Sequence, residues 1–342
     1  MYQLIKPVLF TLDPELIHDL TLNILSKIGS LLKRSSVNDE AELACEIAGI
    51  NFPNRIGLAA GMDKACLAPL AWQGLGFGFI EIGTVTNVAQ AGNEKPRLFR
   101  IKEKNSLLNC LGFNNLGAEK VAEKLKLLRE NSQFKIPIGI NIGKSRIIDP
   151  RNPEEVIKDY LASLELLENY ADYIAINVSS PNTPGLREWE SPNQLKKLLE
   201  PIIQKTIKPV FLKISPDMED ENLYQVLEIS ENLKIKGLVA TNTTTERQNT
   251  PLWANSQMGG ISGELLKARS LRITKLIGKN KSKNLALISV GGISSLEDIK
   301  IRLDSGADLI QIYTALVYEG PFLINKINEN LLDKTKIAKT DL

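Results

Sequence analysis

The sequence predicts an α/β protein, a (β/α)8 TIM barrel with an N-terminal helical hairpin extension. Short apolar runs alternate with amphipathic stretches along most of the chain, a pattern typical of βαβ units and a parallel sheet. Eight such runs follow residue 55, and eight strands close a barrel of this kind. The first 35 residues break the alternation and have helical spacing instead.

Composition narrows the function before any motif is considered. The 342 residues are 43% hydrophobic and 24% charged, which is ordinary for a globular protein. A net charge of +2 is too balanced for a protein whose main partner is nucleic acid. The three cysteines form no CxxC pair and His18 is the single histidine, so we expect no disulfide framework, no Ser-His-Asp triad and no metal site. No apolar run approaches the roughly 20 residues of a membrane-spanning helix, and no secretory signal is expected.

Residues 1–40 are expected to form a separate N-terminal segment, and residues 41–335 the catalytic barrel. Asp13 and Pro14 have the chemistry of a helix N-cap followed by the first helical position. An apolar stripe then recurs at helical spacing: Leu16, Ile17, Leu20, Ile24, Ile28 and Leu31, broadened by Leu22, Leu25 and Leu32. Two interpretations stay open, a helix docked on the barrel core and a helical hairpin with one face in a lipid interface.

The eight predicted strands are continuous apolar runs, as expected for strands buried on both faces. They are Arg55–Ala60, Phe79–Thr84, Pro137–Ile142, Tyr173–Ser179, Val210–Ser215, Gly237–Thr243, Leu285–Gly292 and Leu309–Ala315. Amphipathic helices are predicted between them, among them Pro153–Tyr170, Glu219–Leu233 and Gly263–Gly278. A short hairpin around Gly49 is expected to close the barrel bottom. A doubly wound open sheet is the alternative, but the first strand-to-helix turn lacks the GxGxxG fingerprint.

The active site of such a barrel lies at the C-terminal ends of its strands. The residues predicted there are mostly amides, hydroxyls, glycines and lysines. Asp63 and Glu81 are the only carboxylates near these ends, which disfavours a glycosidase and divalent-metal chemistry. Gly291 and Gly292, together with the glycine-rich stretch Gly259–Gly263, favour a ligand that carries phosphate, although the latter also suits a mobile lid.

Lys213 ends the fifth predicted strand and has three interpretations. It forms a Schiff base, it is a fixed cation beside a ligand that gains negative charge, or it is a rim lysine that reaches solvent. Amides recur at neighbouring strand ends and suit a planar ligand with carbonyl and N–H edges, such as a pyrimidine or an isoalloxazine; they are Asn141, Asn177, Asn182 and Asn242. A Schiff-base aldolase and a non-enzymatic membrane-associated binding module remain the alternatives.

The string Asn177–Arg187, NVSSPNTPGLR, resembles the signature loop of class 2 dihydroorotate dehydrogenases, the quinone-linked flavoenzymes of pyrimidine synthesis. Other strings resemble the same family over residues 5–330: GLAAGMDK (57–64), GFGFIEIGTVT (76–86), KPRLFR (95–100), LGFNNLG (111–117), GINIGK (139–144), ATNTT (240–244) and GGISG (259–263). The resemblance implies oxidation of (S)-dihydroorotate to orotate with a quinone as electron acceptor, in de novo UMP synthesis. It also implies one non-covalent FMN per chain, a monomer, and a peripheral membrane protein on the cytoplasmic face of the bacterial inner membrane, attached to lipid through residues 1–35.

The resemblance also assigns roles to residues. Ser180 matches the catalytic base, which takes the C5 proton while the C6 hydride passes to FMN N5; Thr183 and a bound water are expected to assist it, because no histidine is near. The FMN contacts are matched by Ala60, Gly61, Met62, Asp63, Lys64, Thr84, Asn141, Asn177, Lys213, Thr241, Gly263, Gly292, Tyr313 and Thr314. The substrate contacts are matched by Lys64, Asn109, Cys110, Leu111, Gly112, Phe113, Asn177, Asn182, Asn242 and Thr243, and the quinone passage by His18, Arg100 and Tyr313. Ala65-Cys66 and Cys110 depart from the family pattern and place two thiols near the site.

Overall fold

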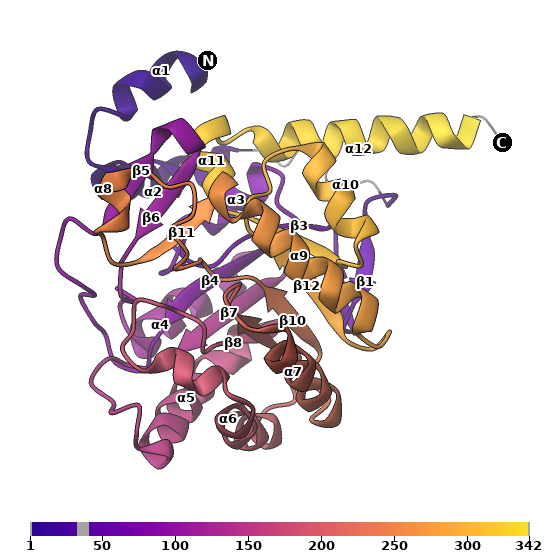
Figure 1. Cartoon of the computed structure of the whole chain (residues 1–342). Coiled ribbons are helices and arrows are strands. Elements are labelled where there is room, and N and C mark those ends of the chain that lie inside the picture. Colours follow the sequence, from indigo (N-terminus) through magenta and orange to yellow (C-terminus); the bar gives the residue numbers. More distant parts are fainter. Residues whose placement is uncertain (1, 33–40, 341–342) are drawn as a thin grey trace.

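The computed structural model describes residues 2–32 and 41–340, with side chains described as far as Leu332 (Figure 1). Eight parallel strands form a closed barrel, in which the last strand pairs with the first, so the predicted fold is confirmed and the open sheet is excluded. The strands are β3 (Ile56–Leu58), β4 (Phe79–Val85), β7 (Ile138–Gly143), β8 (Tyr173–Asn177), β9 (Val210–Ile214), β10 (Gly237–Ala240), β12 (Ala286–Val290) and β13 (Leu309–Ile312).

Helices surround the barrel (Figure 1). They are α3 (Pro69–Gly74), α4 (Ala118–Glu130), α5 (Pro153–Leu167), α6 (Pro192–Lys205), α7 (Asp220–Asn232), α9 (Glu264–Asn280), α10 (Leu296–Asp304), α11 (Thr314–Glu319) and α12 (Leu323–Thr340), with the short α8 (Leu252–Asn255) in the loop after β10. The three predicted helices are present as α5, α7 and α9. Asn152 caps α5, because its side chain accepts a hydrogen bond from the Glu155 N–H.

At the N-terminal ends of the strands, aromatic rings that lie over glycines fill the barrel interior. Gly57 pairs in register with Phe79, and Gly237 with Phe211. A Cβ atom built on either glycine would stand 2.2 Å from the partner's ring, so only glycine leaves room for these side chains. The hairpin of β1 (Cys45–Ile47) and β2 (Ile50–Phe52) closes this end as predicted, with the Phe52 ring 5.1 Å from that of Phe79.

A second, three-stranded antiparallel sheet was not predicted. It consists of β5 (Leu98–Ile101), β6 (Ser106–Asn109) and β11 (Gly260–Gly263). Because β11 pairs with β6 at every one of its residues, the glycine-rich stretch is an ordered strand and not a free lid. This pairing brings Gly260 opposite Asn109, although 151 residues separate them in the chain.

The N-terminal segment forms a hairpin of two helices, and the second helix docks on the core, as the first interpretation predicts. Its helices are α1 (Tyr2–Leu9) and α2 (Pro14–Ile28), and Asp13 caps α2 by accepting from the Leu16 N–H. Leu22 and Leu25 of α2 are buried in the main core, whereas the stripe residues Leu16, Leu20, Ile24, Ile28 and Leu31 are exposed. The predicted boundary near residue 40 lies outside the described residues.

Ionic and polar contacts fasten this hairpin to the barrel. The buried Glu15 carboxylate lies 2.7 Å from Arg97 Nη2, just before β5. Burial opposes ionisation, but hydrogen bonds and charge from Arg97 hold the pKa of Glu15 below its usual value. On α1, the Tyr2 hydroxyl donates to the carbonyl of Val317 in α11 at 2.5 Å. Within the described part of the chain, no helix has both the length and the apolar character needed to cross a bilayer.

Candidate functional site

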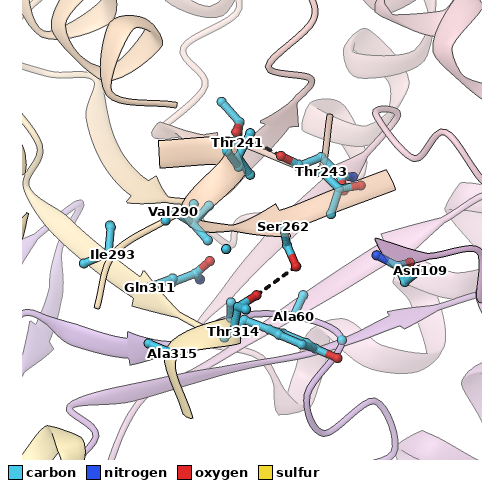
Figure 2. Close-up of a pocket in the computed structure, with 18 of the residues that line it drawn as sticks. Ala60, Asn109, Thr241, Thr243, Ser262, Val290, Ile293, Gln311, Thr314 and Ala315 are labelled. Carbon is cyan, nitrogen blue, oxygen red and sulfur yellow. Dashed lines mark hydrogen bonds between the residues drawn. The ribbon is translucent and has the colours of Figure 1, made fainter. Parts of the chain in front are cut away.

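A large cavity opens at the C-terminal end of the barrel (Figure 2). About 1250 Å³ of space free of protein atoms lies in it, its mouth open to solvent included. Most sequence-predicted positions line it: Ala60, Gly61, Lys64, Thr84, Asn109, Leu111, Gly112, Phe113, Asn177, Ser180, Asn182, Lys213, Thr241, Asn242, Thr243, Gly263, Gly292, Tyr313 and Thr314. The strand ends therefore converge as the barrel geometry predicts.

Four predicted contacts do not line this cavity: Met62, Asp63, Asn141 and Cys110. The Asp63 carboxylate instead accepts from the backbone N–H groups of Leu67 and Ala68 and from Trp72 Nε1, so it shapes the loop before α3. Asn141 lies beneath the cavity, where its Oδ1 accepts from the Thr84 hydroxyl at 2.6 Å. The Cys110 thiol points to the Arg97 carbonyl, 3.6 Å away.

Neither nearby thiol has the properties of a base. Burial raises the pKa of Cys110 and raises that of Cys66 well above its ordinary value. A thiol is basic only as thiolate, which burial in apolar surroundings disfavours. Ser180 therefore has no competing cysteine in this cavity.

Ser180 lies on the loop after β8 and is 4% exposed. Its Oγ accepts from the Asn182 N–H at 3.2 Å. Thr183, on the same loop, has a buried Oγ1 without a hydrogen-bond partner among the described residues. Ser180 is therefore shielded from water. The Thr183 hydroxyl, three residues further along the chain, is free to form hydrogen bonds with a ligand or a water molecule.

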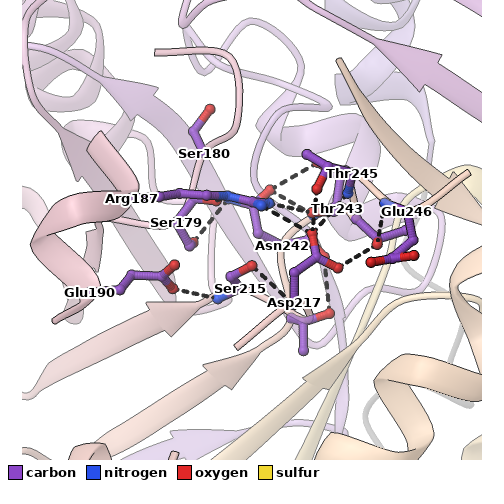
Figure 3. A network of polar contacts seen from close by, with 12 residues as sticks. Ser179, Ser180, Arg187, Glu190, Ser215, Asp217, Asn242, Thr243, Thr245 and Glu246 are labelled. Atoms are coloured by element: carbon purple, nitrogen blue, oxygen red, sulfur yellow. Dashed lines mark hydrogen bonds and ion pairs between the residues drawn. The ribbon is translucent and has the colours of Figure 1, made fainter. Parts of the chain in front are cut away.

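Arg187 fixes the serine loop to the loops after β9 and β10 (Figure 3). Arg187 donates from Nε to the Ser179 carbonyl and from Nη2 to the Thr243 carbonyl, and its Nη1 lies 3.0 Å from Asp217 Oδ2. Burial opposes ionisation of Asp217, but hydrogen bonds from Thr244, Thr245 and Arg187 lower its pKa. The two loops that carry Ser180 and Asn242 are thus held as one unit.

Amide side chains from different strands contact each other at the cavity wall. Asn177 Nδ2 donates to Asn141 Oδ1 at 3.1 Å, and Asn242 Nδ2 donates to Asn177 Oδ1 at 3.3 Å. Asn182 Nδ2 donates to Asn109 Oδ1 at 3.0 Å. The predicted grouping of amides is therefore present, with Asn141 as its inner member. These contacts fix which amide edges remain to face a ligand.

Lys213 has a carboxylate partner that its sequence neighbours did not suggest. Its Nζ lies 3.6 Å from Glu81 Oε1, and both side chains are buried. Glu81 also accepts from Asn141 Nδ2, the Tyr173 hydroxyl and Gln311 Nε2, at 2.9, 3.0 and 2.7 Å. Lys213 is therefore buried in an ion pair at the cavity floor and does not reach solvent, so its interpretation as a rim lysine is wrong.

The part of the cavity beside β11 and β12 has the character of a phosphate site. Its wall includes Gly263, Gly291, Gly292, Ser294 and Thr314. Gly292 has φ +66°, and a Cβ there would stand 2.4 Å from the Lys267 backbone, so the loop requires glycine. The buried Arg302 donates to the Gly291 carbonyl at 2.9 Å and adds positive charge behind the loop. Sequence reasoning missed Arg302 because it lies on α10, away from any strand end.

Other lining residues were also missed. They come from the second sheet and its β5–β6 connection, from α9, from β12 and the loop after it, and from β13 and α11: Asn105, Ser262, Glu264, Leu266, Val290, Ile293, Gln311, Ala315, Tyr318 and Glu319. In Figure 2 the Ser262 and Thr314 side chains face each other, with their hydroxyl oxygens 2.8 Å apart. Because β11 belongs to the second sheet and lies outside the barrel, the strand pattern of a parallel barrel could not show that its residues line the cavity.

A second cavity lies between the hairpin and the barrel. It is lined by His18 and Leu22 of α2 and shares Lys64, Leu111 and Tyr313 with the first cavity. Burial and the charge of Lys64 lower the pKa of His18 to about 4. Burial also lowers the pKa of Lys64 to about 8. His18 of the hairpin and Tyr313 of the barrel therefore line the same cavity.

Arg100 does not line the second cavity. Its Nη1 donates to the Leu12 carbonyl at 2.7 Å, and its guanidinium lies over the Phe10 ring at 4.8 Å. Arg100 thus holds the connection between α1 and α2. Across residues 2–32 and 41–340, no group of His, Cys, Asp or Glu side chains could bind a metal ion.

Comparisons with known proteins point to one family. A family model described as "Dihydroorotate dehydrogenase" matches residues 42–334. Two similar curated proteins are named "Dihydroorotate dehydrogenase (quinone)": one from Christiangramia forsetii, 42% identical over 98% of this chain and 99% of its own, and one from Thermus thermophilus, 44% identical over 95% and 94%. A solved ligand-free dihydroorotate dehydrogenase from Eimeria tenella has 31% identity and a TM-score of 0.88, and covers 95% of this chain and 96% of its own. The same protein in complex with ferulenol gives 30% identity and a TM-score of 0.86 over 96% and 93%.

Proposed function

Because this chain belongs to the dihydroorotate dehydrogenase family, we propose a role for each of its two cavities. The chain oxidises dihydroorotate to orotate in pyrimidine biosynthesis, with a quinone as the electron acceptor, and it depends on a flavin. The observation that carries the assignment of the site is the barrel-mouth cavity, which brings Ser180, Lys213 and a set of amides together at one end of the barrel.

The flavin is FMN, one per chain and bound without a covalent link. The fit is supported by Gln311, which lines the cavity and has a buried Oε1 without a partner among the described residues. The glycine loop at Gly291 and Gly292 suits the phosphate, and Lys213 suits the ring edge that gains negative charge. When bound, FMN supplies the two-electron chemistry between the substrate and the quinone. The proposed contacts are Ala60, Gly61, Lys64, Thr84, Asn177, Lys213, Thr241, Gly263, Gly292, Tyr313 and Thr314, with Asn141 behind them.

The substrate lies over Ser180, and Ser180 Oγ takes the C5 proton. Asn109, Asn177, Asn182 and Asn242 orient the pyrimidine by its carbonyl and N–H edges. Phe113 and the loop that Arg187 holds exclude water, which strengthens these contacts. Thr183, with a bound water, assists the proton transfer from Ser180, and the further substrate contacts are Lys64, Leu111, Gly112 and Thr243.

The quinone reaches the flavin through the second cavity. His18 and Tyr313 line this passage, and Arg100 keeps the hairpin in position. The exposed outer face of α1 and α2 lies in the surface of a membrane, which for a bacterial protein is the cytoplasmic face of the inner membrane. A single chain holds both cavities, which supports a monomer.

One experiment tests this proposal as a whole. The purified protein is expected to show a flavin absorption band, and acid precipitation should release the flavin as FMN, not FAD. Anaerobic dihydroorotate should bleach the band in one turnover, and a short-chain quinone should restore it. A colourless protein that binds no added FMN, or a flavin that dihydroorotate does not reduce, would contradict the assignment.

A further inference from the structure

The cavity floor contains two opposite charges that are both removed from water. Glu81 is 0% exposed and Lys213 is 5% exposed, and their charged atoms lie 3.6 Å apart. Lys213 lines the cavity directly, whereas Glu81 lies one layer below and reaches the cavity through Lys213 and Gln311. Any ligand on this floor therefore experiences the sum of two charges, not the lysine alone.

Three neutral groups fix the position of the Glu81 carboxylate. Its Oε2 accepts from the Tyr173 hydroxyl and from Gln311 Nε2, and its Oε1 accepts from Asn141 Nδ2. These donors come from three different strands of the barrel, β8, β13 and β7. These contacts hold the carboxylate in one place, so Glu81 and Lys213 form a pair of fixed geometry.

We propose that Glu81 is a positioning residue that sets the reduction potential of the bound flavin by partly neutralising Lys213. Two-electron reduction at neutral pH adds a negative charge to the flavin ring, and a cation at the ring edge favours that form. Glu81 offsets this attraction and keeps the potential lower than Lys213 alone would. A lower potential leaves the reduced flavin a stronger reductant toward the quinone. This inference rests on the proposed flavin site and adds an assignment for a residue that does not line it.

The substitution Glu81→Gln removes the charge with little change in shape. The new amide can satisfy its neighbours, because the Tyr173 hydroxyl can turn to accept and Gln311 can present its Oε1, which has no partner among the described residues. Lys213 then keeps its charge without a buried counter-charge. A charge at this distance shifts a proton equilibrium by about one to three pKa units, so an effect of about tenfold or more is expected on binding of a second anion nearby.

The test uses two readouts that do not depend on turnover, made on the flavin-loaded protein. A potentiometric titration against a reference dye measures the reduction potential, and a sulfite titration measures the affinity of the oxidised ring for an anionic adduct. Glu81→Gln should give a more positive potential and bind sulfite about tenfold or more tightly. Lys213→Met should give a more negative potential and bind sulfite more weakly, and the double variant should lie between the two single variants.

Tyr173→Phe is the matched control, because it removes one contact to Glu81 and leaves both charges in place. It should keep the parent potential and sulfite affinity, and a shift equal to that of Glu81→Gln would overturn the electrostatic role. If Glu81→Gln does not retain flavin, Glu81→Asp takes its place. Its shorter side chain moves the carboxylate away from Lys213, so the reduction potential should again become more positive. A flavin-loaded Glu81→Gln or Glu81→Asp protein with the parent potential would overturn the inference, whereas a parent protein without flavin would instead refute the proposed function.

Discussion

At the scale of single residues, we expect the reaction to depend most on Ser180. Ser180→Ala should retain the flavin, because neighbouring residues on other strands line the same cavity. Turnover should fall by about 10²–10⁴-fold, the usual contribution of a positioned base. The measurement is stopped-flow bleaching of the flavin by dihydroorotate. Ser180→Cys should keep some activity that rises with pH, since the thiolate is the basic form. Bleaching by Ser180→Ala at the parent rate would contradict the role of the serine.

His18 makes stability depend on pH. Burial and Lys64 lower its pKa to about 4 from an ordinary value of 6.5, so the neutral imidazole is the form that the folded protein favours. The unfolded chain binds the proton first as the pH falls, and the folded state therefore loses stability between about pH 6.5 and pH 4. Urea titrations at pH 7.5 and 5.0 should show a smaller loss for His18→Gln than for the parent. An equal loss in both proteins would show that His18 does not carry this dependence.

At the scale of elements, the hairpin has a buried and an exposed apolar face, for which we predict separate roles. Leu22 and Leu25 belong to the core, so complete deletion of the hairpin would also uncover part of the barrel. A substitution confined to the outer face avoids this problem. Leu16, Leu20 and Ile24 are 58%, 50% and 49% exposed on α2, and an apolar helix face of this kind binds in the surface of a bilayer.

The triple variant Leu16→Ser, Leu20→Ser and Ile24→Ser should lose sedimentation with vesicles and reduction of long-chain quinones. Flavin bleaching by dihydroorotate should survive, because both cavities remain intact. The control is Leu127→Ser with Ile207→Ser, which removes two exposed apolar side chains, 68% and 99% exposed, from the barrel. Parent-like vesicle binding by the triple variant, or an equal loss in the control, would contradict a lipid-facing hairpin.

At the scale of the whole molecule, the barrel depends on glycines that face aromatic rings. Gly237→Ala would place a Cβ 2.2 Å from the Phe211 ring, and overpacking of a core typically costs about 1–3 kcal/mol. Urea unfolding should show this loss of stability. Adding Phe211→Leu should recover part of it, because the smaller side chain makes room for the methyl group. If the double variant loses as much stability as the two single variants together, the glycine is not needed to make room for the Phe211 ring.

Local patterns were sufficient for the eight barrel strands, for the second helix of the hairpin and for the residues at the strand ends. Buried parallel strands read as continuous apolar runs, and their C-terminal ends must meet at one end of a barrel, so Ser180, Lys213 and the amides could be grouped from the sequence. The second sheet could not be predicted, because β11 joins β6 across about 150 residues and neither strand has a periodicity that names its partner. Met62, Asp63 and Cys110 are adjacent in sequence to lining residues without lining the cavity themselves, and Asn141 lies beneath the cavity against Thr84.

The sequence by itself determined the barrel, the hairpin and the chemistry of the strand ends, because these follow from residue type and spacing along a chain. Only the tertiary structure decided which groups pair. Glu81 and Lys213 are 132 positions apart in a sequence that suggests no link between them, yet closure of the barrel places their charged atoms within 3.6 Å. Likewise, the docking of α2 on the barrel decided which of its apolar residues are buried in the core and which are exposed to solvent. Both outcomes depend on long-range packing, which hydrophobic periodicity constrains but does not specify.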